Sequence, residues 1–129
     1  MTSRRMTDRK KKIIELLSIR DRDQLLYFCF DGGLFGFTVI SREVFGVDDF
    51  HLNESQRVSL YRTLRGMVAD GLLVTRKQMG DGTANSLPNW QTYWHLQGKL
   101  DYDVSILVEW EAGADKRQAE ALNNFLNRL

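Results

Sequence analysis

The stretch from Asn53 to Leu96, NESQRVSLYRTLRGMVADGLLVTRKQMGDGTANSLPNWQTYWHL, decides the fold of this chain. Gln56 follows Asn53 at the spacing of a capping box, in which the two side chains close the first turn of a helix. Apolar side chains then recur at helical spacing and form one stripe: Leu60, Tyr61, Leu64, Met67 and Val68. The pair Asp70-Gly71 is typical of a helix end. The stretch therefore begins with a capped amphipathic helix.

Two short strands are predicted after this helix. Residues 72–74 are apolar and indicate a half-buried strand, from which Arg76 and Lys77 continue. The segment from Met79 to Gln91 contains glycines, asparagines and the only proline, which predicts a loop. The returning strand carries three aromatic side chains: Trp90, Tyr93 and Trp94. They can stack on nucleic-acid bases, but packing of the sheet on the helices is the interpretation we favour.

The helix face opposite the apolar stripe carries small side chains and arginines: Ser55, Val58, Ser59, Arg62, Gly66 and Ala69, with Arg65 at its edge. Small side chains let a helix approach a groove closely, and arginine can bond guanine edges or phosphates. The alternative is an ordinary solvated helix face. The predicted DNA-binding residues are Ser55, Arg57, Ser59, Arg62, Arg65, Arg76 and Lys77.

Residues 59–77, SLYRTLRGMVADGLLVTRK, resemble the recognition helix and first wing strand of bacterial winged-helix regulators of the broad MarR and PadR type. The resemblance lies in a Leu-rich helix, an acidic-Gly-Leu turn and a basic strand, carried by Leu60, Leu64, Met67, Asp70, Gly71, Leu72, Val74, Arg76 and Lys77. It is a pattern of residue types and covers about a third of the chain. It implies a winged helix-turn-helix that binds duplex DNA as a homodimer and controls transcription.

Composition is typical of one folded domain over residues 1–129. The chain is 43% hydrophobic and has a single proline, which argues against disorder. We expect a mainly helical α+β fold, with an extra N-terminal helix and a C-terminal extension. No apolar run approaches the roughly 18 residues that span a membrane, and no signal-peptide core follows the basic start. Cys29 lies in an apolar run and is predicted to be a buried small hydrophobe. As the single cysteine it cannot form an internal disulfide, which suits a cytoplasmic protein.

The net charge of +1 is unevenly distributed along the chain. Residues 1–20 carry seven basic and two acidic side chains, and residues 53–78 carry five and two. Residues 21–52 carry two basic and six acidic side chains, and residues 79–129 carry four and seven. Positive charge thus collects on the N-terminal segment and on the predicted DNA-binding helix with its strand, as expected for a protein with one basic face.

Three helices are predicted before Asn53. The first runs from Asp8, its expected cap, to Ile19, after a flexible basic tail over residues 1–7. Its basic first turn, residues 9–12, fits a phosphate partner, although solubility alone also explains it. The second, Asp21 to Phe30, is apolar nearly all round, which indicates a buried position. The third runs from Thr38, as cap, to Phe45 and would be the first helix of the helix-turn-helix.

The link from Gly46 to Asn53 is longer than the 3–4-residue turn of the simplest helix-turn-helix. Asp48 and Asp49 place negative charge in this link, close to the predicted DNA-binding face.

The C-terminal part contains one ambiguous and one clear element. Residues 101–111 alternate between apolar and polar positions, which favours a strand after a turn at Gly98, but several apolar positions also fit a helix. Asp115 to Leu129 predicts an amphipathic helix at residues 113–129, which is a possible dimerisation element. Its proposed dimerisation residues are Leu122, Phe125, Leu126 and Leu129.

No sequence pattern indicates catalysis, a metal ion or a cofactor. His51 and His95 lie in different predicted elements, and no His/Cys spacing fits zinc. We therefore expect a cytoplasmic DNA-binding homodimer without enzymatic activity, most simply a transcriptional regulator. Two alternatives stay open: DNA binding in plasmid or phage partition or replication control, and a winged-helix protein-interaction module that does not bind DNA.

Overall fold

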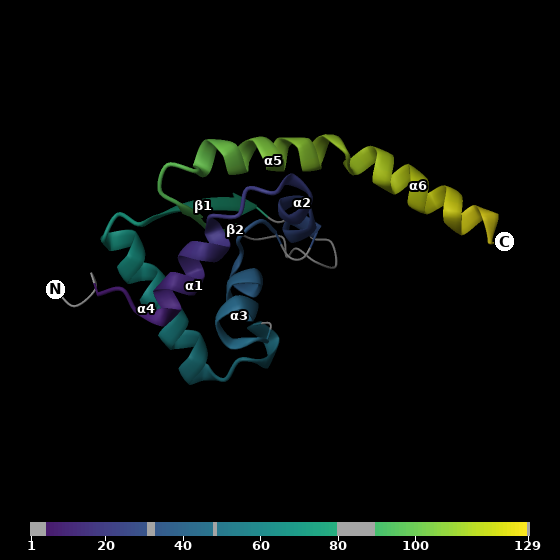
Figure 1. Cartoon of the computed structure of the whole chain (residues 1–129). Coiled ribbons are helices and arrows are strands. Elements are labelled where there is room, and N and C mark those ends of the chain that lie inside the picture. Colours follow the sequence, from purple (N-terminus) through teal and green to yellow (C-terminus); the bar gives the residue numbers. More distant parts are fainter. Residues whose placement is uncertain (1–4, 31–32, 48, 80–89, 129) are drawn as a thin grey trace.

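The computed structural model describes residues 5–30, 33–47, 49–79 and 90–128. Over these residues the chain has a mainly helical α+β fold with a two-stranded antiparallel sheet, as predicted (Figure 1). The elements are α1 (Asp8–Leu17), α2 (Arg22–Phe30), α3 (Phe37–Phe45), the 3₁₀ helix η2 (Asp49–His51), α4 (Glu54–Ala69), β1 (Leu73–Met79), β2 (Trp90–Leu96), α5 (Leu100–Ala112) and α6 (Ala114–Asn127).

The small sheet separates two groups of helices. Successive side chains of a strand point to opposite faces. One face of β2 carries Trp94, whose ring packs against Phe37 of α3 and Tyr61 of α4. The other face carries His95, which contacts Asp103 of α5. The core therefore has α1, α3 and α4 on one side of the sheet, and α5 with its neighbour α2 on the other.

Helix α4 begins and ends as the sequence predicts. The Asn53 side chain accepts from the Gln56 backbone at 2.8 Å, and the Gln56 side chain accepts from the Asn53 backbone at 3.1 Å, which completes the capping box. At the other end Gly71 takes a left-handed φ of 78°, where a side chain would be strained. Leu60, Leu64 and Met67 are fully buried, so the predicted stripe faces the core.

Two predicted caps lie one or two residues from the real ones. Thr7, not Asp8, caps α1, because its hydroxyl accepts from the Lys10 backbone at 3.2 Å. Gly36, not Thr38, precedes the first turn of α3. Within the predicted tail, the Arg5 carbonyl accepts from Lys10 Nζ at 2.9 Å, which holds this segment against α1.

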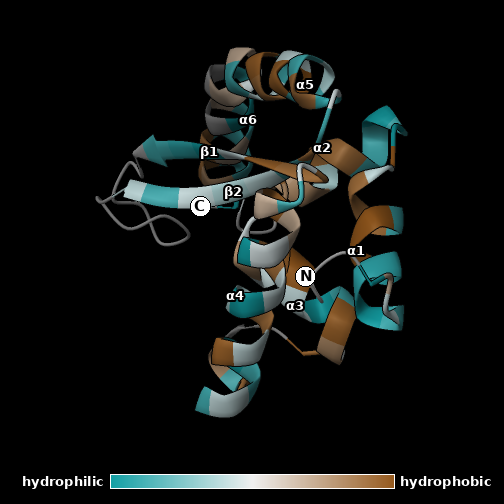
Figure 2. Ribbon diagram, turned by 90° about the vertical axis from the view of Figure 1, so that its left-hand side faces the viewer, coloured by the Kyte–Doolittle hydropathy of each residue, from teal (hydrophilic) through white to brown (hydrophobic). Residues whose placement is uncertain are grey.

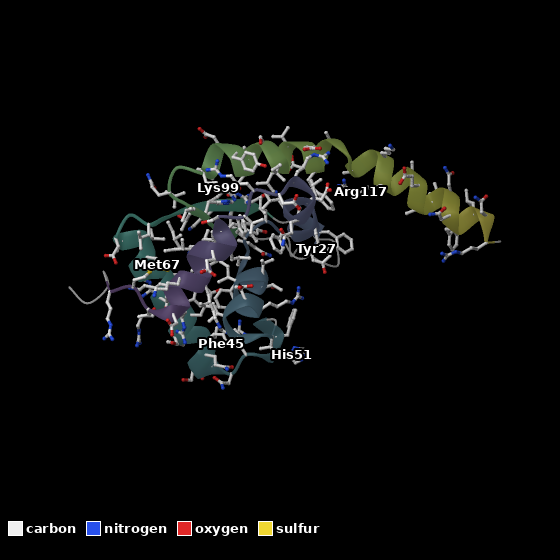
Figure 3. The ribbon with its side chains drawn as sticks, viewed as in Figure 1. Tyr27, Phe45, His51, Met67, Lys99 and Arg117 are labelled. Atoms are coloured by element: carbon white, nitrogen blue, oxygen red, sulfur yellow. The ribbon has the colours of Figure 1, made fainter. Side chains whose placement is uncertain are left out.

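Helix α2 is less buried than its composition predicts. Leu25 and Cys29 are buried, but Tyr27 and Phe30 are more than 60% exposed. Helix α2 packs mainly on α5. Phe30 meets the ring of Trp110 there, with the centroids 6.4 Å apart, but most of its surface stays exposed. Figure 3 shows Tyr27 projecting outward from this helix. The prediction of an all-round buried helix is therefore wrong for these two aromatic residues.

The sheet is longer than predicted. The antiparallel pairing runs from Leu73 opposite Leu96 to Met79 opposite Trp90. Met79, Trp90 and Gln91 therefore belong to strands, although the sequence pattern placed them in the loop. The rest of the predicted loop, residues 80–89, lies outside the described residues, as do Asp31, Gly32 and Asp48.

The segment predicted as a strand at residues 101–111 is the helix α5, so the favoured prediction is wrong. The turn at Gly98 is confirmed, with a left-handed φ of 85°. Lys99, Asp103 and Ile106 are buried and recur at helical spacing, which turns one side of α5 toward the sheet. Asp103 falls on the polar positions of the sequence alternation, but it is buried rather than solvated.

Helix α6 confirms the predicted C-terminal helix and leaves the body of the molecule. Figure 1 shows it extending from the end of α5 with no other element beside it. All of the described side chains from Ala119 to Arg128 are exposed. Within the described ranges, none of the helices combines the length and apolar character needed to cross a lipid bilayer.

Candidate nucleic-acid interface

The outward face of α4 is open to solvent. Ser55, Arg62 and Arg65 are exposed there, together with Val58 and Ala69. These positions lie opposite the buried stripe because an α-helix turns about 100° per residue. Three of the seven predicted DNA-binding residues therefore lie on one accessible helix face.

A shallow, open depression lies along the first half of α4. Its volume is about 570 Å³. Its lining residues are Glu54, Ser55, Val58, Ser59 and Arg62. The surface thus combines a carboxylate, two hydroxyls, an apolar side chain and a guanidinium. Such a mixture can contact both the polar and the methyl groups on base edges.

Arg9 ties α1 to α4 next to this depression. Its Nη1 atom donates to Ser59 Oγ at 2.6 Å and to Thr63 Oγ1 at 3.3 Å. Its guanidinium lies over the ring of Phe45 in α3, 5.0 Å from the centroid. The Ser59 hydroxyl therefore binds the Arg9 guanidinium and is not fully open to solvent. The basic first turn of α1 is held beside α4, which adds positive charge to this side of the molecule.

Arg57 and Arg76 do not lie on the open surface where they were expected. Arg57 is half-buried on the flank of α4. Arg76 turns toward α5: its Nε donates to His95 Nε2 at 3.1 Å and its Nη1 donates to Gln78 Oε1. Its guanidinium also lies 4.5 Å from the ring centroid of Tyr93. Burial is the largest influence on the pKa of Arg76 and lowers it.

Lys77 lies where the sequence places it, exposed on β1. It shares a sheet face with Thr92 and Trp90 of β2, and this face continues from Trp94, which packs beside α4. The strands extend beyond α4 on one side (Figure 2). Trp94 and Tyr93 are buried, as the packing interpretation predicts, whereas Trp90 at the outer end is 66% exposed.

Behind the sheet, four linked polar side chains form a buried polar chain that the sequence interpretation missed: Arg76, His95, Asp103 and Lys99. His95 Nδ1 lies 2.8 Å from Asp103 Oδ2, and Lys99 Nζ lies 2.9 Å from Asp103 Oδ1. The three side chains have at most 1% of their surface exposed. Figure 3 shows Lys99 beneath the start of α5. The available signal was the spacing of Lys99 and Asp103, which suits an i,i+4 ion pair on a helix.

The geometry fixes the tautomer of His95. A guanidinium only donates hydrogen bonds, so Nε2 must accept from Arg76. The ring proton then lies on Nδ1 and is donated to Asp103. The chain Arg76–His95–Asp103–Lys99 links both strands of the sheet to the first turn of α5. Buried links of this kind hold neighbouring elements in one arrangement.

The His95–Asp103 pair has the composition of a catalytic dyad, but its position does not suit catalysis. Neither side chain has exposed surface, and the second ring nitrogen of His95 is occupied by Arg76. Cys29 is buried, as predicted, and this burial raises its pKa to about 11, which disfavours the nucleophilic thiolate. Among the described residues, no three His, Cys, Asp or Glu side chains gather as metal ligands.

The predicted dimerisation stripe is exposed on α6. Leu122, Phe125 and Leu126 are each more than half exposed, and Leu129 lies outside the described residues. Arg117 fixes the start of the helix, because its Nη2 donates to the Trp110 carbonyl at 2.7 Å and its guanidinium lies 3.6 Å from that ring's centroid (Figure 3). The helix therefore has a defined attachment to α5 and an uncovered apolar stripe.

Comparisons of the chain with protein-family models, with curated proteins and with solved structures found no match.

Proposed function

We propose that the protein binds duplex DNA as a winged helix-turn-helix, with α4 as recognition helix and β1–β2 as wing. The observation that carries this proposal is the open face of α4, on which Arg62 and Arg65 are exposed beside small side chains. Helix α3 precedes α4 as the first helix of the pair, and the two are joined by η2. The order of helix pair and two-stranded wing is the one that DNA-binding proteins of this type use.

In the proposed complex, α4 enters the major groove. Its 16 residues make a rod of about 24 Å, which is long enough to follow the groove past several base pairs. Arg62 contacts base edges, and Arg65 contacts bases or phosphate. Lys77 of the wing contacts the backbone beside the groove. Arg76 supports the wing from behind through His95 and does not touch DNA.

The proposed assembly is a homodimer joined by the α6 stripe. An isolated helix of this length is marginal in water, so its exposed Leu122, Phe125 and Leu126 require a partner. A two-fold dimer would place two copies of α4 in successive major grooves, roughly 34 Å apart. The proposed role is sequence-specific regulation of transcription. DNA binding for partition or replication control would use the same surface.

A protein-interaction module is the second candidate function. Two observations favour it: the net charge of only +1, and the exposed Tyr27 and Phe30 on α2. Exposed aromatic residues are frequent at protein interfaces. The exposed cations on α4 and the Arg9 anchor beside them favour DNA, which is why duplex binding is the main proposal.

Paired substitutions test the proposal. Arg62→Ala should weaken binding to a selected site by about 1–3 kcal/mol and relax sequence preference, because a base contact is lost. Lys77→Ala should weaken all duplexes about equally and reduce the salt slope by about one unit, because a phosphate contact is lost. Both effects can be measured by fluorescence anisotropy after selection of bound sequences from a random pool.

Lys116→Ala is the matched control. It removes the same charge from an exposed position on α6, away from the proposed DNA surface, and should leave affinity nearly unchanged. Equal, small effects at Arg62, Lys77 and Lys116 would show that DNA does not meet this face of the protein.

A further inference from the structure

Val58 is an apolar side chain where a solvated helix face would carry a polar one. It is 48% exposed and is one of the residues that line the depression on α4. Tyr61, the neighbouring exposed apolar residue, differs because its ring stacks on Phe37 with centroids 4.1 Å apart. Val58 therefore offers its methyl groups to a molecule that occupies the depression.

Val58 lies in line with two polar groups. Ser55, Val58 and Arg62 follow one another at i, i+3 and i+7, so they fall within a narrow sector of the outward face. Val58 and Arg62 are four residues apart, which is about 6 Å along the helix. Base pairs in B-DNA are about 3.4 Å apart. The two side chains therefore reach positions about two base pairs apart.

The chemistry of the two side chains selects different bases. A valine has only methyl groups to offer, and thymine is the base that presents a methyl group in the major groove. Any other base edge would place a donor or acceptor against Val58 and leave it unpaired, which costs affinity. A guanidinium can donate to both N7 and O6 of guanine. The hydroxyl of Ser55 can bond to several different bases and therefore contributes little to sequence specificity.

We propose that α4 reads a thymine through Val58 and, about two base pairs away, a guanine through Arg62. This inference rests on the proposed function, because it names the bases that the same surface recognises. Glu54 lines the same depression. Its carboxylate disfavours close approach of a phosphate there and so supports base edges as the groups that occupy the depression.

Base analogues test both contacts directly. Bound duplexes are first selected from a random pool with the wild-type protein. At the selected thymine, deoxyuridine removes only the 5-methyl group and should lower wild-type affinity about three- to fourfold, the effect of one buried methyl-sized group. At the selected guanine, 7-deazaguanine removes one acceptor and should lower affinity roughly tenfold. Val58→Ala, whose shorter side chain ends farther from the thymine methyl, should show a clearly smaller effect of the first replacement, and Arg62→Ala should be insensitive to the second.

The possible outcomes distinguish a failure of the base assignment from a failure of the proposed DNA binding. A deoxyuridine effect that shrinks in Val58→Ala and a 7-deazaguanine effect that disappears in Arg62→Ala support the inference. If duplexes are bound but no thymine–guanine pair is enriched, or if Val58→Ala keeps the full deoxyuridine effect, this base assignment is wrong while DNA binding stands. If no duplex is bound at all, the proposed function itself fails. Val58 is exposed, so the alanine variant is expected to fold; its circular dichroism spectrum checks this.

Discussion

Asp103→Ala is expected to lower the free energy of unfolding by about 3–5 kcal/mol, which is the usual result of removing one partner of a buried ion pair. The reason is that Lys99, with 1% of its surface exposed, would keep a charge with no carboxylate beside it. His95 would also lose the acceptor for its Nδ1 proton. Urea denaturation followed by circular dichroism measures the change.

Two further variants make this prediction specific. Asp101→Ala removes an exposed carboxylate from the first turn of the same helix and should lower stability by less than about 1 kcal/mol, the usual contribution of an acid at a helix N-terminus. Lys99→Met combined with Asp103→Leu removes both buried charges and should recover much of the loss, because apolar residues often replace a buried ion pair without cost. A loss below about 1 kcal/mol for Asp103→Ala would contradict a stabilising role for the buried polar chain Arg76–His95–Asp103–Lys99 behind the sheet.

The second large effect is expected from substitutions in the apolar stripe of the C-terminal helix α6. Leu122→Asp combined with Phe125→Asp should convert the proposed homodimer into a folded monomer, because each carboxylate would be buried against an apolar partner surface. Affinity for a duplex with two half-sites should then fall by about 10²- to 10⁴-fold, since the second half-site no longer adds its effective concentration. Light scattering reports the mass, and anisotropy reports the affinity.

Asn124→Asp combined with Asn127→Asp is the matched control, because it adds the same charge to α6 on the side away from the stripe. It should leave the dimer intact. A wild-type protein that is monomeric at tens of micromolar would contradict the dimer. Unfolding of the whole molecule by the stripe variant would show that α6 packs on its own domain.

Helix α4 could be predicted because independent signals in the sequence agree. The Asn53–Gln56 capping box, the apolar period and the Gly71 end each mark the same element, and the structure contains all three. Such agreement between local signals is what makes an element predictable. The strand pair after it followed from the same kind of evidence, although its paired length exceeded the prediction by several residues.

Helix α5 was predicted wrongly because its burial depends on charged residues. A strict alternation places Asp103 with the polar positions of a strand. In the structure Asp103 is fully buried, and its charge is met by Lys99 and His95. Charged residues are seldom buried unless they are paired. A hydrophobicity pattern therefore assigns every charged residue to the solvent, including one that is buried with its partners.

The position of Arg76 could not be predicted for a related reason. Strand alternation puts Arg76 on one sheet face and Lys77 on the other, but it does not say which face is covered by the rest of the molecule. That choice depends on α5, which supplies Asp103 behind His95 and thereby draws Arg76 inward. The candidate site could therefore be predicted on α4, where one face is fixed by its own stripe, and less well on the wing.

The salt dependence of duplex binding tests the central claim most directly. With four to six phosphate contacts, a plot of log affinity against log salt concentration should have a slope of roughly −4 to −5, at about −0.9 per contact. Anisotropy titrations of the full chain with labelled genomic fragments give this slope. We expect binding at low salt that weakens steeply as salt rises. Absence of binding at low salt, or an affinity that does not change with salt, would contradict the proposal that this protein binds DNA.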